Sequence, residues 1–297
     1  MNFKNALKIT FHEYKTYLKS LIYRLILFVC FFSLGYVLLK DFLASMASQG
    51  TLNTFFKSVK ESFVGFVKGR GWTNKNNLAT SFKDLVNLFF KNLNKHYVKT
   101  TLFFASFILY IMLNTLADVA LTDCNYNFMS NGSRRGFFGA IIKNLRNGSV
   151  YAILYAIYSL AIIVILFFLS IALIMALMNV IGFFTMPLIV FIVIFSFALK
   201  QRIISTLLPK MIAEDKSVFT CIKENKIVNF WDELIKYTFA YFTCFTLCMI
   251  FFVFTFGAGT ILALPLLSIM VNVMGLTSYF ENNNQRYYVS ENEVYKY

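Results

Sequence analysis

The chain has 297 residues, of which 58% are hydrophobic and 19% aromatic, whereas only 14% are charged. Soluble domains carry about 25% charged residues, so this deficit excludes an ordinary water-soluble enzyme or binding domain and favours a polytopic membrane protein. The formal net charge is +14. Because the basic residues flank apolar segments, we attribute the charge to membrane topology and anionic lipid head groups, and we expect no nucleic-acid partner.

Six apolar segments of about 20 residues each predict transmembrane helices. The clearest evidence is the stretch Val150–Leu199, which contains no Lys, Arg, Asp, Glu or His and is long enough for two spans with a turn near 178–187. The sequence therefore predicts an all-α fold, a transmembrane helical bundle in which residues 1–297 form a single integral membrane domain. We place the six spans near residues 18–39, 100–121, 150–175, 181–200, 237–256 and 260–280.

The long basic loop 40–99, between the first two spans, contains two segments with helical periodicity. We expect two basic amphipathic helices, which could lie on a lipid surface or form a small helical cap over the transmembrane bundle; the two arrangements can coexist. The apolar positions are Phe55, Phe56, Val59, Phe63 and Val67 in the first helix, and Phe82, Leu85, Phe89 and Leu93 in the second.

The distribution of basic residues predicts the orientation. Of the 28 Lys and Arg residues, ten lie in the loop 40–99, and the other eighteen lie in segments that share one side with the N-terminus. The positive-inside rule applies to short loops and loses its force for a loop of about 60 residues, so the ten basic residues of the loop 40–99 count less. We therefore expect both termini in the cytoplasm.

A weak repeat suggests how such a bundle is assembled. The motifs FKNALK at 3–8, FGAIIK at 138–143 and VFTCIK at 218–223 share an apolar first, an aliphatic fifth and a Lys sixth position, and a pair of spans follows each. They predict three units, each with a cytoplasmic amphipathic helix followed by a helical hairpin. Chance matching in a Lys-rich membrane protein is the alternative.

Three polar residues within the spans form the candidate site. Arg24 and Asp118 each lie a little over one turn inside an apolar segment, at the cytoplasmic ends of antiparallel spans, and we expect them to pair. Asn114 lies four residues before Asp118, on the same helical face. The cluster could gate or line a cavity, join helices, or consist of side chains that snorkel separately to the interface. Asn272 is a comparable inward-facing polar residue in the last span.

The inventory of reactive side chains is small. The sequence has five Cys and two His residues, and His12 and His96 lie far from Cys244 and Cys248. No nucleotide-binding, metalloprotease or hydrolase motif is present. We therefore expect neither a metal nor a cofactor, and no catalytic residue is assigned.

The segment 207–242 carries a family resemblance. Pro209 follows a span, Glu214 and Asp215 form a short acidic segment, and a helix around Val218–Ile227 precedes the next span. In this order the segment resembles six-helix bacterial membrane proteins of unknown function, including the membrane domain attached to some glycerophosphodiester phosphodiesterases. The resemblance implies the bacterial cytoplasmic membrane and carries over no catalytic residue, because no phosphodiesterase domain is present.

Three functions follow as hypotheses. The first is a non-enzymatic accessory or transport-associated membrane subunit that binds anionic membrane lipids and a membrane-protein partner such as a transporter component. The second is the handling of a lipid or another amphiphile. The third is an intramembrane enzyme, although two histidines and one embedded acid offer few groups for general acid–base catalysis.

Overall fold

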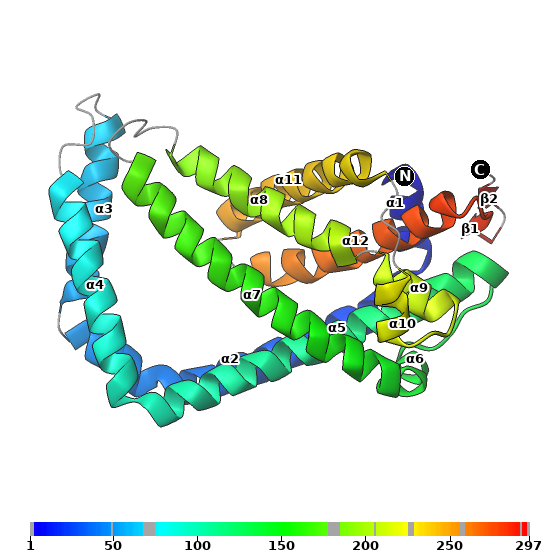
Figure 1. The fold of residues 1–297 in the computed structure, drawn as a ribbon, viewed down its shortest axis with the longest axis horizontal. Helices are drawn as coiled ribbons and strands as arrows, with labels where there is room; N and C mark the ends of the chain where they lie inside the picture. The colour runs from blue at the N-terminus through cyan, green and yellow to red at the C-terminus, as the bar shows by residue number, and fades with distance from the viewer. Residues whose placement is uncertain are drawn as a thin grey trace. The chain divides into compact units, whose positions relative to one another are not determined.

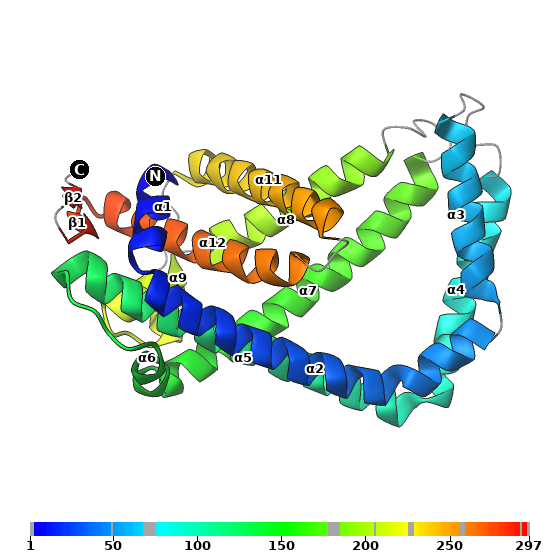
Figure 2. The same cartoon turned by 180° about the vertical axis from the view of Figure 1, so that it is seen from behind.

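The computed structural model describes residues 3–48, 50–67, 75–177, 185–204, 206–224, 229–255, 259–291 and 293–295, and these residues are almost entirely helical. Figures 1 and 2 trace the elements along the chain. Five helical segments are long and apolar enough to cross a membrane. The expected all-α class is thereby supported, and the structure is consistent with a multi-pass membrane protein. These segments are Tyr14–Ser45, Tyr97–Asn131, Leu145–Leu169, Pro187–Ala213 and Phe230–Phe254.

A helix also covers the sixth predicted span, 260–280, although it is not one of these five. The turn predicted near 178–187 falls largely on 178–184, which lies outside the described residues.

The chain divides into two compact units. Unit 1 comprises Met1–Phe28, Tyr110–Ile162 and Val193–Tyr297, and unit 2 comprises Val29–Leu109 and Ile163–Ile192. Four long helices have residues in both units: α2 (Tyr14–Ser48), α5 (Tyr97–Asn131), α7 (Leu145–Leu177) and α8 (Thr185–Ile204). The other elements of unit 1 are α1 (Phe3–His12), α6 (Phe137–Lys143), α9 (Leu207–Ala213), α10 (Val218–Lys223), α11 (Phe230–Phe254), α12 (Thr260–Asn282), β1 (Tyr287–Ser290) and β2 (Glu293–Tyr295).

The core of unit 1 forms around the second half of α5. Small residues such as Ala117 and Ala120 are fully buried there, in one cluster with Ile269 and Met274 of α12. Small side chains let helix backbones approach closely, which is the usual way for helices to pack within a membrane. Gly148 likewise lets α7 approach α5 closely, because an added Cβ there would lie only 3.2 Å from the side chain of Leu116.

Each of the three motifs of the proposed repeat lies in a short helix. Ala6 of α1, Ala140 of α6 and Cys221 of α10 are all fully buried. In α6 and α10 the buried residue three positions earlier is Phe137 or Val218. The register that burial defines for the second motif is therefore one residue earlier than the sequence pattern suggested.

Unit 1 also contains a β-hairpin that the sequence analysis did not predict. Strands β1 and β2 pair antiparallel, with Tyr287 opposite Tyr295. Tyr287 and Val289 alternate toward the core, as expected for a strand with one buried face. The hairpin contacts α1, where Asn5 Nδ2 donates to the Tyr287 hydroxyl at 3.1 Å and Lys8 Nζ lies 2.8 Å from Glu293 Oε1.

Unit 2 contains the two helices expected in the loop 40–99, α3 (Thr51–Val67) and α4 (Lys75–Lys95), which lie side by side (Figures 1 and 2). Phe42 at the end of α2 and Leu88 of α4 form a small core with Leu52, Leu85, Phe89 and Leu93 around it. The hydroxyls of Ser58 and Ser81 are 3.2 Å apart in the buried contact between the two helices.

The predicted apolar face of the first of these helices is only partly described. Phe55 lies beside Phe82, with ring centroids 6.1 Å apart, and Phe56 is exposed. The side chains of Val59, Phe63 and Val67 lie outside the described residues.

Candidate functional site

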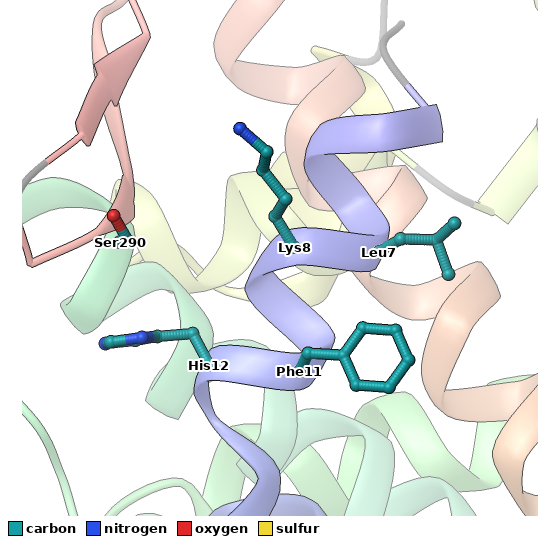
Figure 3. A pocket seen from close by; sticks show the side chains of 5 residues that line it. All are labelled: Leu7, Lys8, Phe11, His12 and Ser290. Atoms are coloured by element: carbon teal, nitrogen blue, oxygen red, sulfur yellow. The ribbon is translucent and has the colours of Figure 1, made fainter.

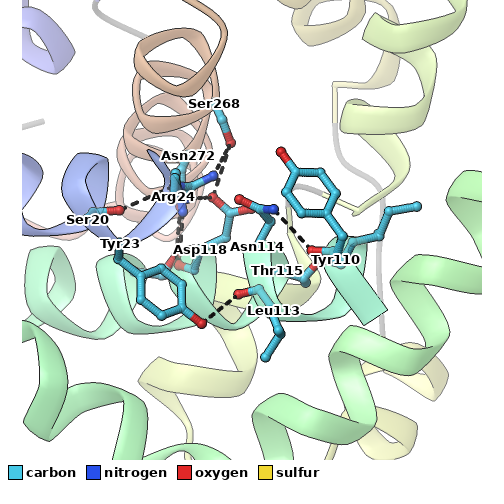
Figure 4. A network of polar contacts seen from close by, with 12 residues as sticks. Ser20, Tyr23, Arg24, Tyr110, Leu113, Asn114, Thr115, Asp118, Ser268 and Asn272 are labelled. Atoms are coloured by element: carbon cyan, nitrogen blue, oxygen red, sulfur yellow. Dashed lines mark hydrogen bonds and ion pairs between the residues drawn. The ribbon is translucent and has the colours of Figure 1, made fainter. Parts of the chain in front are cut away.

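Arg24 and Asp118 form an ion pair, as the sequence predicted. Arg24 Nη2 of α2 lies 2.7 Å from Asp118 Oδ1 of α5, and the side chains are 5% and 21% exposed (Figure 4). A charged group in an apolar environment is costly unless it is paired and hydrogen-bonded, so the pairing satisfies both side chains.

Two serines complete the pair. The Arg24 Nε donates to Ser20 Oγ at 3.3 Å, and the Arg24 Nη1 donates to Ser268 Oγ at 3.3 Å. Ser268 of α12 in turn donates to Asp118 Oδ1 at 3.2 Å. All three nitrogens of the guanidinium are therefore engaged, and α12 joins α2 and α5 at the same place (Figure 4).

Asn272 adds a second link between α5 and α12. Its Nδ2 donates to the backbone oxygen of Asp118 at 3.0 Å, and its Oδ1 accepts from Thr122 Oγ1 at 2.6 Å. The side chain thus faces inward, as the sequence predicted. An amide that reaches the backbone of a neighbouring helix fixes the register of the two helices.

Asn114 lies beside the pair but bonds within its own helix. Its Nδ2 donates to the Tyr110 backbone oxygen at 3.0 Å (Figure 4). Of the three candidate residues, the structure therefore joins Arg24 and Asp118 by direct contact and does not bring Asn114 into their hydrogen-bond network.

Sequence reasoning missed Ser20, Ser268 and Thr122. Each lies four residues from a member of the cluster, before Arg24, before Asn272 and after Asp118 respectively. Residues four apart share a helical face, so an i, i+4 search around each embedded charge or amide would have found all three. We call Arg24, Asp118, Ser20, Ser268, Asn272 and Thr122 the intramembrane network.

A second buried ion pair was missed entirely. Arg202 Nη1 at the end of α8 lies 3.1 Å from Glu233 Oε2 near the start of α11. Glu233 Oε1 also accepts hydrogen bonds from Ser278 Oγ and from Asn282 Nδ2, the latter at 2.8 Å. Arg202 and Glu233 lie at the margins of the predicted spans, where a charged residue is ordinarily solvated, so the sequence carried no signal for their burial.

Two further carboxylates near the ends of the spans are paired. Asp123 accepts two hydrogen bonds from Arg135 Nη1, at 2.9 and 2.8 Å. Glu13 pairs with Arg134 at 2.9 Å, and this contact raises the pKa of the Arg134 guanidinium. Arg134 also lies 3.1 Å from Glu291, beside the hairpin. These pairs connect the segment after α5 to the N-terminal and C-terminal segments of unit 1.

A shallow groove of about 500 Å³ lies elsewhere in unit 1, between α1 and the hairpin. Its lining consists of Leu7, Lys8, Phe11, His12 and Ser290 (Figure 3). Lys8 is already paired with Glu293, and Figure 3 shows Phe11 and His12 on different sides of α1. The groove therefore offers no convergent set of polar groups. Among the described residues, no group of three or more His, Cys, Asp or Glu side chains could hold a metal ion.

The intramembrane network is the candidate site, because it contains Arg24 and Asp118, two of the three site residues predicted from the sequence, in direct contact. Its chemistry is that of a fixed, mutually neutralised ion pair that links three helices. Comparison of the chain with protein-family models, with curated proteins and with solved structures finds no match to any of them.

Proposed function

We propose that the protein is a non-enzymatic, multi-pass accessory subunit of the bacterial cytoplasmic membrane that associates with a transport complex. The observation that supports this most directly is the intramembrane network. Its carboxylate and guanidinium neutralise each other, and its hydroxyls and amide link α2, α5 and α12. A neutralised and hydrogen-bonded network fixes helix positions, which is what a scaffold subunit requires.

The apolar surface of α11 supports a role in assembly. Phe239, Phe242, Phe251 and Phe252 are all exposed along this helix. Large exposed apolar patches are characteristic of surfaces that contact lipid or another protein. A partner helix could pack against the side of α11 that carries Phe239 and Phe242, which are three residues apart, because aromatic side chains dominate the energetics of many interfaces.

Contact between the two ends of the chain favours an even number of spans. Helix α1 bonds to the hairpin through Asn5 and Tyr287 and through Lys8 and Glu293, and this contact supports a placement of both segments on one side of the membrane. Five spans would separate them. We therefore propose six spans, with α12 as the sixth, and the cytoplasm as the location of both termini.

The three repeat units remain part of this proposal. The short helices α1, α6 and α10 each precede a long helix and each bury a small residue at an equivalent position. Exposed apolar side chains accompany them, including Phe138 and Ile142 on α6 and Phe219 and Ile222 on α10. Such helices suit the cytoplasmic membrane interface.

Reporter fusions test the orientation. A periplasm-active reporter fused near residue 70 is expected to be active, and the same reporter fused after Lys216 is expected to be inactive. A cytoplasm-active reporter should give the reverse pattern. Cytoplasmic exposure near residue 70 would contradict the proposed topology.

Isolation from the native membrane tests the proposed association. The protein is solubilised in a mild, lipid-preserving system, and the co-purifying proteins are quantified by mass spectrometry. We expect a stoichiometric transporter component, such as an ATPase or a permease. Variants with Phe239→Ser and Phe242→Ser should reduce its recovery, whereas Lys236→Gln on the same helix should not. Recovery of the chain without any stoichiometric membrane partner would argue against the accessory role.

Handling of a lipid or amphiphile is the second candidate, and the surface of unit 2 favours it. Phe56 and Phe90 are exposed on α3 and α4, and exposed lysines accompany them. Basic helices with exposed aromatic residues bind anionic lipid surfaces. The lysines are Lys57, Lys60, Lys83 and Lys91.

Hydrogen exchange of residues 51–95 in the full-length protein tests this candidate. Nanodiscs of phosphatidylcholine are compared with nanodiscs that also contain phosphatidylglycerol. We expect the anionic lipid to slow exchange, and we expect Lys57→Gln with Lys60→Gln to remove the difference. Equal exchange in both lipids would contradict a role for this surface in lipid handling.

A further inference from the structure

Lys200 is a cation within the apolar part of unit 1. It lies on α8, within the segment Pro187–Ala213, which is apolar enough to cross a membrane. Its Nζ is 4.4 Å from the centre of the Tyr155 ring on α7. Among the described residues, Lys200 forms no ion pair with a carboxylate. Its interaction with an aromatic face therefore stands in place of a counter-ion.

The nearby carboxylate is already engaged. Asp118 pairs with Arg24 at 2.7 Å and accepts a further hydrogen bond from Ser268. Asp118 also interacts electrostatically with Lys200 and with the tyrosines around it, so these groups occupy one region of unit 1. Two cations, Arg24 and Lys200, thus lie in the region of one carboxylate, and the described ion pair of that carboxylate is with Arg24. An uncompensated charge in a low-dielectric region is costly, and a bound anion would offset that cost.

Hydrogen-bond donors line the same region on α7. Tyr151, Tyr155 and Ser159 recur at a spacing of four and therefore share one helical face. Ser159 is buried, and its hydroxyl lies beside Tyr155 without a well-formed hydrogen bond among the described residues. Tyr241 of α11 interacts electrostatically with Tyr155 and belongs to the same region.

We propose that Lys200, with the hydroxyls of Tyr155 and Ser159, binds the anionic phosphate or carboxylate group of a membrane amphiphile. The ammonium supplies the charge, and the hydroxyls supply directional donors. The site lies next to the intramembrane network, on the side of Asp118. The ion pair of Asp118 with Arg24 keeps this carboxylate from neutralising Lys200. This inference rests on the proposed membrane placement of α8, and it does not depend on a protein partner.

Native mass spectrometry of the full-length protein tests the site. The protein is reconstituted in phosphatidylcholine nanodiscs with a minor fraction of phosphatidylglycerol, released, and analysed for retained lipid. We expect one phosphatidylglycerol to be retained per chain. Lys200→Met should reduce that retention about ten-fold, as expected for loss of a charge-assisted contact. Lys200→Arg should preserve it, and Lys236→Met, which removes an exposed lysine of α11, serves as the matched control.

Each result has a defined meaning. Equal retention by wild type and Lys200→Met would overturn the proposal, as would equal losses in Lys200→Met and Lys236→Met. A protective shift in thermal unfolding with inorganic phosphate in pure phosphatidylcholine, lost in Lys200→Met, would support the anion site and identify free phosphate as a source.

The proposal also predicts that the hydroxyls of Tyr155 and Ser159 contribute to lipid retention. Ser159→Ala and Tyr155→Phe should each weaken retention while leaving elution in size-exclusion chromatography unchanged, which separates a binding defect from misfolding. Unchanged retention in both variants would overturn the assignment of these donors. Failure to find a stoichiometric protein partner would count against the accessory role and leave this result unaffected.

Discussion

Arg202 Nη1 and Glu233 Oε2 lie 3.1 Å apart, and the two side chains are 0% and 5% exposed. The pair joins the end of α8 to the start of α11, and the further hydrogen bonds to Glu233 from Ser278 and Asn282 bring in the end of α12. One carboxylate thus links three helices. The burial of this pair suggests that its loss would affect stability more than any surface charge.

We expect Glu233→Gln to lower the free energy of unfolding by about 3–5 kcal/mol, because it leaves the Arg202 guanidinium buried without its counter-ion. Thermal unfolding in detergent, followed by size-exclusion chromatography with fluorescence detection, measures the loss. Asp232→Asn is the control, because Asp232 is the exposed neighbour of Glu233. The double variant Arg202→Met with Glu233→Leu should recover most of the stability. Additive losses in that double variant would show that the two residues are not coupled.

The intramembrane network predicts different outcomes for neighbouring residues on α5. Asp118→Asn should destabilise the protein by about 3 kcal/mol, because the buried Arg24 loses its counter-ion. Asn114→Ala should have an effect below about 1 kcal/mol, since the described hydrogen bond of Asn114 stays within its own helix. Cysteines at positions 24 and 118 in a background without native cysteines should crosslink in membranes. Failure to crosslink would refute the pairing.

The small core of unit 2 predicts how two substitutions on α4 change the local stability. Leu88 is 7% exposed and packs beside Phe42, whereas Phe90 is 58% exposed. Leu88→Ala should destabilise this helix pair by about 2–5 kcal/mol, and Phe90→Ala should change its stability by less than about 0.5 kcal/mol. Hydrogen exchange across residues 51–95 reports the difference. Faster exchange in Phe90→Ala than in Leu88→Ala would show that the core of this unit lies elsewhere.

Tyr287 makes the docking of the hairpin on α1 dependent on pH. Burial raises the pKa of the Tyr287 phenol above its ordinary value of 10.0, and Glu281, whose Oε1 accepts a hydrogen bond from the phenol at 3.1 Å, raises it further. Because the folded pKa exceeds the unfolded one, the stabilisation is complete below pH 10 and is lost as the pH rises toward the folded pKa.

Limited proteolysis of the C-terminal segment checks this prediction. We expect cleavage to increase between pH 9 and pH 11 in the wild type. In Tyr287→Phe the hairpin should be cleaved faster at pH 9, because Asn5 and Glu281 lose their partner, but the further rise with pH should be smaller. An identical pH dependence in the two proteins would assign the effect to other groups.

The amino-acid sequence by itself determined the class of this protein and part of its site. Long apolar runs must form helices in lipid, because backbone polar groups find no water there. This logic located the long helices, although α2 and α5 continue well beyond the predicted spans 18–39 and 100–121, to Ser48 and Asn131. It also identified Arg24 and Asp118, because charges within apolar runs are rare and need partners. The helical periodicity of α3 and α4 was also visible in the sequence, because one face of each helix is apolar.

Only the tertiary structure decided which side chains contact one another. Ser268 and Thr122 are ordinary residues in the sequence and make their contacts in the network only because α2, α5 and α12 meet at one place, whereas Ser20 bonds to Arg24 within α2. The burial of Arg202 and Glu233 and the hairpin beside α1 likewise depend on contacts between residues far apart in the chain. Periodicity reports which face of a helix is apolar, whereas the identity of the neighbour on that face follows from the packing of all the helices together.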